Sequence, residues 1–160
     1  MCSFPIDDSI CNGRTIFYLL VWDLQTGNCR QTAGGNRNRV MKYIHVVEDD
    51  QDIRHIIELI LEEEGYQVKT FADATSFHNG MGESVPDLYL LDVMLPDGNG
   101  IDLCQEIRTT KAIKHVPIIM MSAHAKADLI FGQCAVNDFI TKPFDLNDIL
   151  VRIQKQIILH

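Results

Sequence analysis

The 160-residue chain has no long hydrophobic run and no basic leader sequence. Its longest apolar stretch near the N-terminus, residues 15–22, holds eight residues, whereas a membrane-spanning helix needs about 20. Asp7 and Asp8 stand where a signal peptide would carry basic residues. These absences favour a cytoplasmic protein without a membrane partner.

Basic charge is also scarce, since the formal net charge is -8 at pH 7. Direct binding of a nucleic-acid backbone needs a basic face. We therefore expect no direct nucleic-acid partner. The charge is uneven along the chain: residues 1–40 hold four Arg/Lys and three Asp/Glu, and residues 41–160 hold ten and nineteen.

Closely paired cysteines are missing as well. The sequence has no CxxC pair and no zinc-ligand spacing. An odd count also argues against a secreted disulfide framework. We expect free thiols at all five positions, which are Cys2, Cys11, Cys29, Cys104 and Cys134.

A boundary lies near residue 40. Residues 26–40 are polar and rich in Gly, Asn and Arg, as linkers are, and Met41 directly precedes an apolar run. Residues 1–40 could form a small hairpin, a disordered tail, or an upstream extension of a chain that begins at Met41. We favour an N-terminal extension over 1–40 that is disordered or weakly structured, and one folded domain over 41–160.

Strand and helix patterns alternate from Met41 onward. Short apolar runs predict strands, and apolar residues at helical spacing predict helices. The alternation implies a parallel sheet with helices on both faces. The expected strands are 43–47, 67–71, 88–91, 116–121 and 138–141, and the expected helices begin at Gln51, near 73, at Ile101, near 125 and after Asp145.

Polar residues follow four of these strands where each strand ends. Each alone has an ordinary explanation, such as a helix cap, a turn residue or a solvated lysine. In a parallel sheet, however, the carboxyl ends of the strands meet at one edge, where ligands bind. Neighbouring carboxylates repel unless a cation such as Mg²⁺ neutralises them. An aspartate beside such an ion can form an acyl phosphate. The converging residues are Glu48, Asp49, Asp92, Ser122 and Lys142.

Four sequence segments resemble the signature segments of response-regulator receiver domains. They are VVEDDQDIR (46–54), LLDVMLPDGNGID (90–102), IIMMSAHA (118–125) and DFITKPF (138–144). The resemblance covers residues 41–160. It implies an α/β, flavodoxin-like three-layer sandwich with a five-stranded parallel sheet in the order 2-1-3-4-5 and five helices.

The resemblance also implies roles for particular residues. Asp92 corresponds to the phosphoacceptor, and Lys142 and Ser122 to the residues that assist its chemistry. Ser122 and Phe139 correspond to the switch pair, and the Lys142–Pro143 bond is expected to be cis. The implied ligands of Mg²⁺ (or Mn²⁺) are Glu48, Asp49, Asp92 and the backbone carbonyl of Met94.

A receiver of this kind takes a phosphoryl group from a sensor histidine kinase or a histidine phosphotransfer protein. It acts on itself rather than as a turnover enzyme. The resemblance implies an output face, formed by helix 4, strand 5 and helix 5, that binds a downstream protein. Whether phosphorylation also drives formation of a homodimer is left open by the sequence. After Ile158 we expect no room for a DNA-binding output domain. The segment from Ser122 to Lys142 is about two residues shorter than the family's, and Ala135 replaces a usual glycine, so this face departs from the common pattern.

Two alternatives remain. A haloacid-dehalogenase-like phosphatase also forms an aspartyl phosphate, but it needs a second aspartate where this chain has Met94. A degenerate receiver that only binds partners would lack part of the pocket, whereas every key position here holds a competent residue.

Overall fold

The structure is a computed structural model that describes residues 20–22, 29–31, 41–123 and 132–159. The chain divides into two units, Met1–Arg39 and Val40–His160. Within the first unit, β1 (Leu20–Trp22) pairs antiparallel with β2 (Cys29–Gln31). In the described part of the chain, no helix is long and apolar enough to cross a membrane.

The second unit is built on a five-stranded parallel sheet. The strands are β3 (Tyr43–Val47), β4 (Gln67–Phe71), β5 (Leu88–Asp92), β8 (Ile118–Ser122) and β9 (Asp138–Thr141), and their order is β4-β3-β5-β8-β9. This is the 2-1-3-4-5 order that the resemblance implied, and the α/β fold class is confirmed. β5 and β8 are buried at every residue, because helices cover both faces of their continuous apolar runs.

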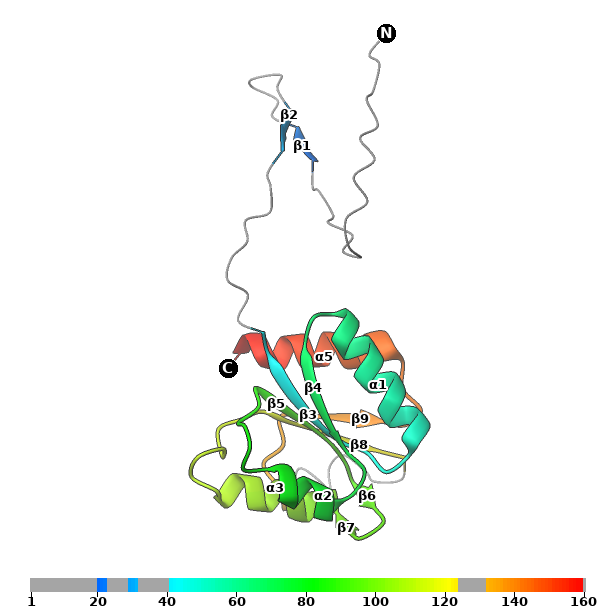
Figure 1. The fold of residues 1–160 in the computed structure, drawn as a ribbon, viewed down its shortest axis with the longest axis vertical. Helices are drawn as coiled ribbons and strands as arrows, with labels where there is room; N and C mark the ends of the chain where they lie inside the picture. Colours follow the sequence, from blue (N-terminus) through cyan, green and yellow to red (C-terminus); the bar gives the residue numbers. More distant parts are fainter. Residues whose placement is uncertain (1–19, 23–28, 32–40, 124–131, 160) are drawn as a thin grey trace. The chain divides into compact units, whose positions relative to one another are not determined.

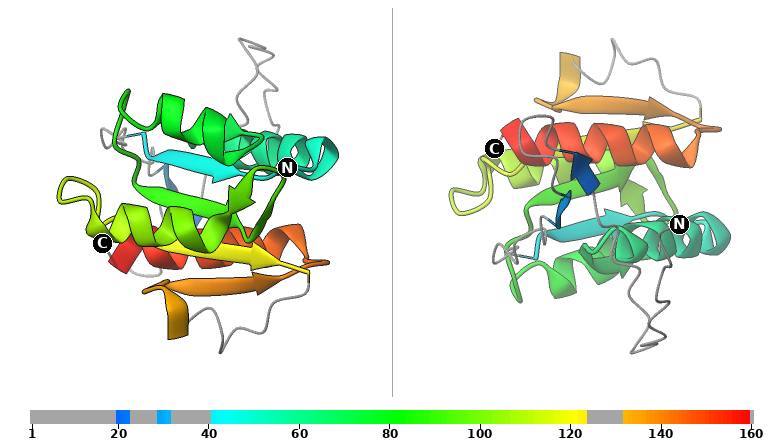
Figure 2. Two further views of the ribbon diagram at one scale, coloured as in Figure 1. Left: turned by 90° about the horizontal axis from the view of Figure 1, so that it is seen from below. Right: turned by 90° about the horizontal axis from the view of Figure 1, so that it is seen from above.

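Helices form the two outer layers (Figures 1 and 2). α1 (Gln51–Glu63) and α5 (Leu146–Leu159) cover one face of the sheet. α2 (Ala74–Gly80) and α3 (Gly100–Thr109) cover the other. Two core clusters separate accordingly, one with Ile57, Ile149 and Ile153, and the other with Phe77 and Ile107.

Local sequence signals account for the helix ends. Asp50 caps α1, since its carboxylate accepts hydrogen bonds from the backbone N–H groups of Asp52 and Ile53. Gly65 directly follows Glu64, the C-cap of α1, with a φ of 83°, a conformation that favours glycine. Asn99 caps α3 through the N–H of Ile101.

Some expectations differ from the structure. β8 begins at Ile118 rather than at residue 116, because Pro117 has no N–H to donate and the carbonyl of Val116 accepts from Arg108 instead. The turn after Asp92 contains a short antiparallel pair, β6 (Met94–Leu95) and β7 (Gly98–Asn99). The helix expected over 125–131 lies outside the described residues.

The expectation of free thiols is wrong for one pair of cysteines. Cys104 and Cys134 form a disulfide across 30 residues of sequence. Spacing along the chain does not reveal this pair, because the two residues meet only when α3 packs beside the segment that precedes β9.

Candidate functional site

The backbone hydrogen bonds of the parallel sheet position the residues at the strand ends. Glu48 directly follows β3, and its N–H still donates to the carbonyl of Phe71 in β4. In the same way the N–H of Lys142, just past β9, donates to the carbonyl of Ser122. Parallel pairing therefore carries these residues to the edge of the sheet where Asp92 ends β5.

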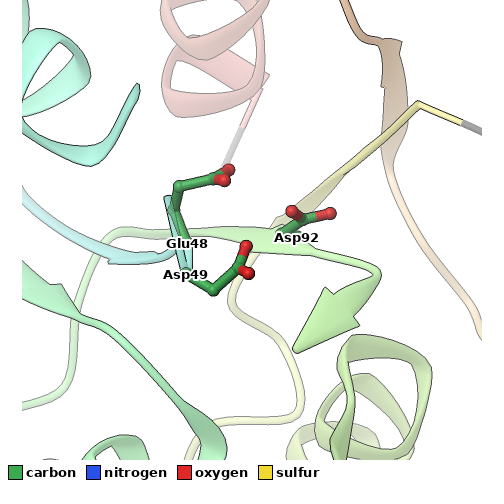
Figure 3. A group of neighbouring side chains, drawn as sticks. All are labelled: Glu48, Asp49 and Asp92. Atoms are coloured by element: carbon green, nitrogen blue, oxygen red, sulfur yellow. The ribbon is translucent and has the colours of Figure 1, made fainter. Parts of the chain in front are cut away.

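Three carboxylates gather at this edge. Glu48, Asp49 and Asp92 each offer an oxygen atom, and these oxygens all lie within 4.8 Å of one another. Figure 3 shows Glu48 and Asp49 coming from the end of β3 and Asp92 from the end of β5. Glu48 and Asp92 are buried, whereas Asp49 is exposed.

Lys142 lies between two of these acids. Its Nζ is 2.6 Å from Glu48 Oε1 and 2.6 Å from Asp92 Oδ2. The side chain of Lys142 is 13% exposed, and those of Glu48 and Asp92 are 0% and 5% exposed. Little water screens these contacts, so the ammonium of Lys142 offsets part of the negative charge of the two buried acids.

The titration of this cluster reflects burial and charge. Burial raises the pKa of Glu48 to about 7, with the charge of Asp92 adding to the rise and the hydrogen bond from Lys142 opposing it. Burial alone would lower the pKa of Lys142. Its hydrogen bonds to Asp92 and Glu48, together with their charges, outweigh burial and raise that pKa.

Two residues that support the acids were not singled out from the sequence. Nη1 of Arg54 in α1 donates to the backbone carbonyls of Glu48 (2.7 Å) and Asp49 (3.1 Å), which holds the acidic pair in place. Arg54 closes the first signature segment, VVEDDQDIR, so its position was visible in the sequence although its role was not.

The other such residue is Asp97, at the turn between β6 and β7. Its carboxylate accepts hydrogen bonds from the N–H groups of Ala74 and Thr75 and from Oγ1 of Thr75. The loop that follows Asp92 is thereby fastened to the start of α2. Position in a Pro-Asp-Gly turn explains the presence of an aspartate, but it does not indicate a contact with α2.

The remaining site positions lie close by. Ser122 ends β8 and is buried, and Phe139 in β9 is partly buried against the core cluster of α2 and α3. The Lys142–Pro143 peptide bond is cis. The N–H of Met94 donates to Asp92 Oδ1 over 3.2 Å, so the loop after Asp92 turns back toward its carboxylate.

The donor set fits a hard divalent cation such as Mg²⁺. Oxygen donors of carboxylates are the ligands that this ion prefers. Glu48 Oε2 is buried and has no hydrogen-bond partner within the described structure. A buried carboxylate oxygen without a partner is costly, and a bound cation would satisfy it.

Comparisons of the sequence identify the family. The profile of the response regulator receiver domain matches residues 44–154. The chain is 37% identical over 113 residues to the transcriptional regulatory protein GltR of Pseudomonas aeruginosa, covering 69% of this chain and 47% of that protein. It is 34% identical over 116 residues to the DNA-binding response regulator MtrA of Mycobacterium leprae, covering 71% and 50%.

The chain spans about half the length of these curated relatives. By name, GltR is a transcriptional regulatory protein and MtrA is a DNA-binding response regulator. The expectation that nucleic acid is not a partner therefore has no support from them.

Solved structures agree with the sequence comparison. The response regulator protein TrrA of Thermotoga maritima, solved in complex with Mg²⁺ and BeF, is 29% identical, with a TM-score of 0.64 over 72% of this chain and 99% of that chain. The chemotaxis response regulator CheY4 of Vibrio cholerae is 23% identical and shares the fold, with a TM-score of 0.68 over 72% and 98%. With the family profile matched over residues 44–154, most of the second unit, the chain belongs to the response regulator receiver domain family of two-component signalling.

Proposed function

We propose that Asp92 is the phosphoacceptor of this receiver domain. The observation that carries the proposal is the convergence of Lys142, Glu48 and Asp92 at the ends of three strands, with 2.6 Å contacts from one ammonium to both acids. An aspartate buried beside a fixed cation is held in one orientation, and its neighbours can stabilise the charge of a transferring phosphoryl group.

In the proposed reaction a carboxylate oxygen of Asp92 attacks the phosphorus of a phosphohistidine. The P–N bond breaks, the imidazole nitrogen of the donor takes up a proton, and an acyl phosphate forms on Asp92. Lys142 stays beside the carboxylate and stabilises negative charge on the phosphoryl oxygens. The hydroxyl of Ser122 donates a hydrogen bond to a phosphoryl oxygen once the group is in place.

The residues proposed to hold Mg²⁺, or Mn²⁺ in its place, are Glu48, Asp49, Asp92 and the backbone carbonyl of Met94. When bound, the ion neutralises the carboxylates and polarises the phosphoryl group. Arg54 keeps the backbone of the acidic pair in position through its two hydrogen bonds.

The donor is proposed to be a sensor histidine kinase or a histidine phosphotransfer protein. The domain acts on itself, promoting its own phosphorylation and dephosphorylation, and is not a turnover enzyme. Phosphorylation would rearrange Ser122 and Phe139 and so change a face formed by the expected fourth helix, β9 and α5. That face is proposed to bind a downstream protein or a second copy of the domain.

Residues 41–160 are proposed to form the receiver domain, and residues 1–40 an N-terminal extension. A cytoplasmic location remains a prediction from the sequence. No feature of the described residues favours the haloacid-dehalogenase-like phosphatase alternative.

Acetyl phosphate with Mg²⁺ tests the assignment directly. Intact-mass measurement is expected to show one added phosphoryl group on the wild-type protein and none on Asp92→Asn. Asp87→Asn is the matched control, since Asp87 lies just before β5 at the opposite end and pairs with Lys42. Chelation of the metal should abolish labelling. Equal labelling of wild type and Asp92→Asn would refute Asp92 as the acceptor.

A further inference from the structure

Outside the acidic site, two cysteines are covalently joined. Cys104 in the middle of α3 is bonded to Cys134, which precedes β9, and their Cα atoms are 6.3 Å apart. This separation lies within the range of natural disulfides. The phosphoryl chemistry proposed for Asp92 makes no use of this bond.

The bond is part of a larger attachment between α3 and residues 133–137. Nε2 of Gln105 donates to the carbonyl of Gln133 over 3.1 Å. Nε of Arg108 donates to the carbonyl of Ala135 over 2.6 Å, and its Nη2 donates to Oδ1 of Asn137 over 2.8 Å. One covalent bond and three hydrogen bonds thus hold the segment on α3.

These hydrogen bonds are solvent-exposed, whereas the disulfide belongs to the core. Exposed hydrogen bonds exchange readily with water and add little net stability. The covalent bond is therefore the strongest single contact between residues 133–137 and α3, beside the apolar packing of Val136 and the hydrogen bonds that join Asn137 to Ile118 of β8. With the bond open, the segment would remain docked by contacts that break and re-form.

The two cysteines differ in solvent accessibility. Cys104 is fully buried, and Cys134 is 6% exposed and lies between Gln133 and Ala135, which are both exposed. A small opening of this segment brings Cys134 into contact with solvent, whereas Cys104 would need α3 to move. In a reducing compartment, such as the cytoplasm that the sequence favours, disulfides are usually transient and redox-sensing.

We propose that Cys104–Cys134 is a reversible thiol–disulfide exchange site that fastens residues 133–137 to α3 when oxidised and releases them when reduced. Its reductant is a thiol, either a small molecule such as glutathione or a protein dithiol, and its oxidant is a small-molecule disulfide. This inference does not depend on the acceptor role of Asp92.

Reduction of the disulfide takes two thiol–disulfide exchange steps. A thiolate of the reductant attacks Sγ of Cys134, the bond between the two cysteines breaks, and the Cys104 thiolate leaves and takes up a proton. A second thiol, from the same dithiol or from another molecule of a monothiol, then attacks the mixed disulfide and releases Cys134 as a thiol. The two reductant thiols are together oxidised by two electrons to a disulfide, and the cysteine pair is reduced by two. A small-molecule disulfide reverses the sequence and leaves as two thiols.

Side-chain packing and the chain itself connect residues 133–137 to the acidic site. Val136 and Phe139 pack against the core cluster that contains both cysteines, and β9 ends one residue before Lys142. A change at residues 133–137 can therefore reach Phe139 through shared packing. We expect amide exchange to respond over residues 133–139 rather than over the whole sheet.

The test uses the full chain in buffers with graded ratios of glutathione to glutathione disulfide. Thiols are blocked with a maleimide, and peptide masses give the oxidised fraction of Cys104 and Cys134 separately from the three N-terminal cysteines. The pair is expected to open and close reversibly while circular dichroism reports a folded protein. Amide exchange at residues 133–137 should be roughly tenfold faster or more in the reduced form, with residues 43–47 unchanged.

Three results would overturn the proposal. The pair could resist millimolar dithiothreitol while the protein stays folded, which would make it a permanent crosslink. It could stay as thiols in excess glutathione disulfide, or exchange at residues 133–137 could be equal in both forms. The double variant Cys104→Ser with Cys134→Ser should match the reduced form in every buffer. If it fails to fold, the wild-type comparison decides the question.

Discussion

A Cβ atom on Gly100 would lie 1.9 Å from the backbone carbonyl oxygen of Asp92. The N–H of Gly100 also donates to the carbonyl of Val93. The first residue of α3 and the end of β5 are therefore in backbone contact, and no side chain fits between them. This contact fixes the loop that returns from Asp92 to the helix.

Gly100→Ala is predicted to destabilise the domain by about 2–3 kcal/mol, because the methyl group meets backbone atoms that cannot rotate away. Urea denaturation gives the loss in unfolding free energy. Gly82→Ala is the matched control, since a Cβ there meets no atom within 4 Å. Equal stabilities of the two variants would contradict the close packing of Gly100.

Lys142→Met is predicted to cost about 3 kcal/mol at pH 8, because two buried carboxylates lose their shared cation. The loss should shrink as the pH falls below the raised pKa of Glu48, since protonated Glu48 needs no counter-charge. Denaturation curves at several pH values without added metal provide the measurement. Lys42→Met breaks the more exposed pair with Asp87 and should cost about 1 kcal/mol or less. A pH-independent loss for Lys142→Met would rule out the electrostatic cause.

His45 predicts a separate pH dependence. Its ring is fully buried beside Tyr43, Phe71 and Tyr89, and neither ring nitrogen has a hydrogen-bond partner in the described structure. Burial, with a further contribution from the charge of Lys69, lowers the pKa of His45 to about 4. The unfolded chain therefore binds more protons between pH 6.5 and pH 4. Stability is fully present above pH 6.5 and is lost as the pH falls, by up to about 3 kcal/mol.

The variant His45→Phe isolates the contribution of His45 to the pH dependence of stability, because it keeps a ring in the aromatic cluster but removes the group that binds a proton. The raised pKa of Glu48 acts in the opposite direction, lowering stability as the pH rises from about 4.5 to 7. Wild type and variant share that contribution, so the difference between their pH profiles reports His45. The exposed His55→Phe is the control. Parallel profiles for wild type and His45→Phe would show that His45 does not titrate in this way.

Asp97→Ala is predicted to loosen the start of α2, because the backbone N–H groups of Ala74 and Thr75 lose their acceptor. The hydrogen bonds to Thr75 and Ala74 also hold the pKa of Asp97 below its usual range. The stability that the ionised carboxylate contributes is therefore lost as the pH falls and the carboxylate is protonated. Amide exchange at residues 74–76 should accelerate, with a smaller loss of stability than for Gly100→Ala. Glu62→Ala, on the exposed side of α1, is the control. Unchanged exchange at residues 74–76 would contradict the cap.

Much of the fold follows from local patterns. The strands 43–47, 67–71 and 138–141 have the predicted bounds, because short apolar runs between turn signals leave few other choices. The amphipathic helices were also predicted, although Ile56, which stands at helical spacing with Ile53 and Ile60 in the sequence, is 46% exposed. Helical spacing alone does not show how wide the covered face is.

The sequence by itself determined that acids, a serine and a lysine stand at strand ends, since the strand pattern and the parallel order put Glu48, Asp92 and Lys142 at one edge. The tertiary structure alone decided that Lys142 contacts both acids, that Arg54 holds the acidic backbone, and that Cys104 meets Cys134. Periodicity describes which face of an element is buried. Contacts between different elements depend on how those elements pack, whether the residues are 6 positions apart, as Arg54 and Glu48 are, or 30 apart, as Cys104 and Cys134 are. No local pattern contains that information.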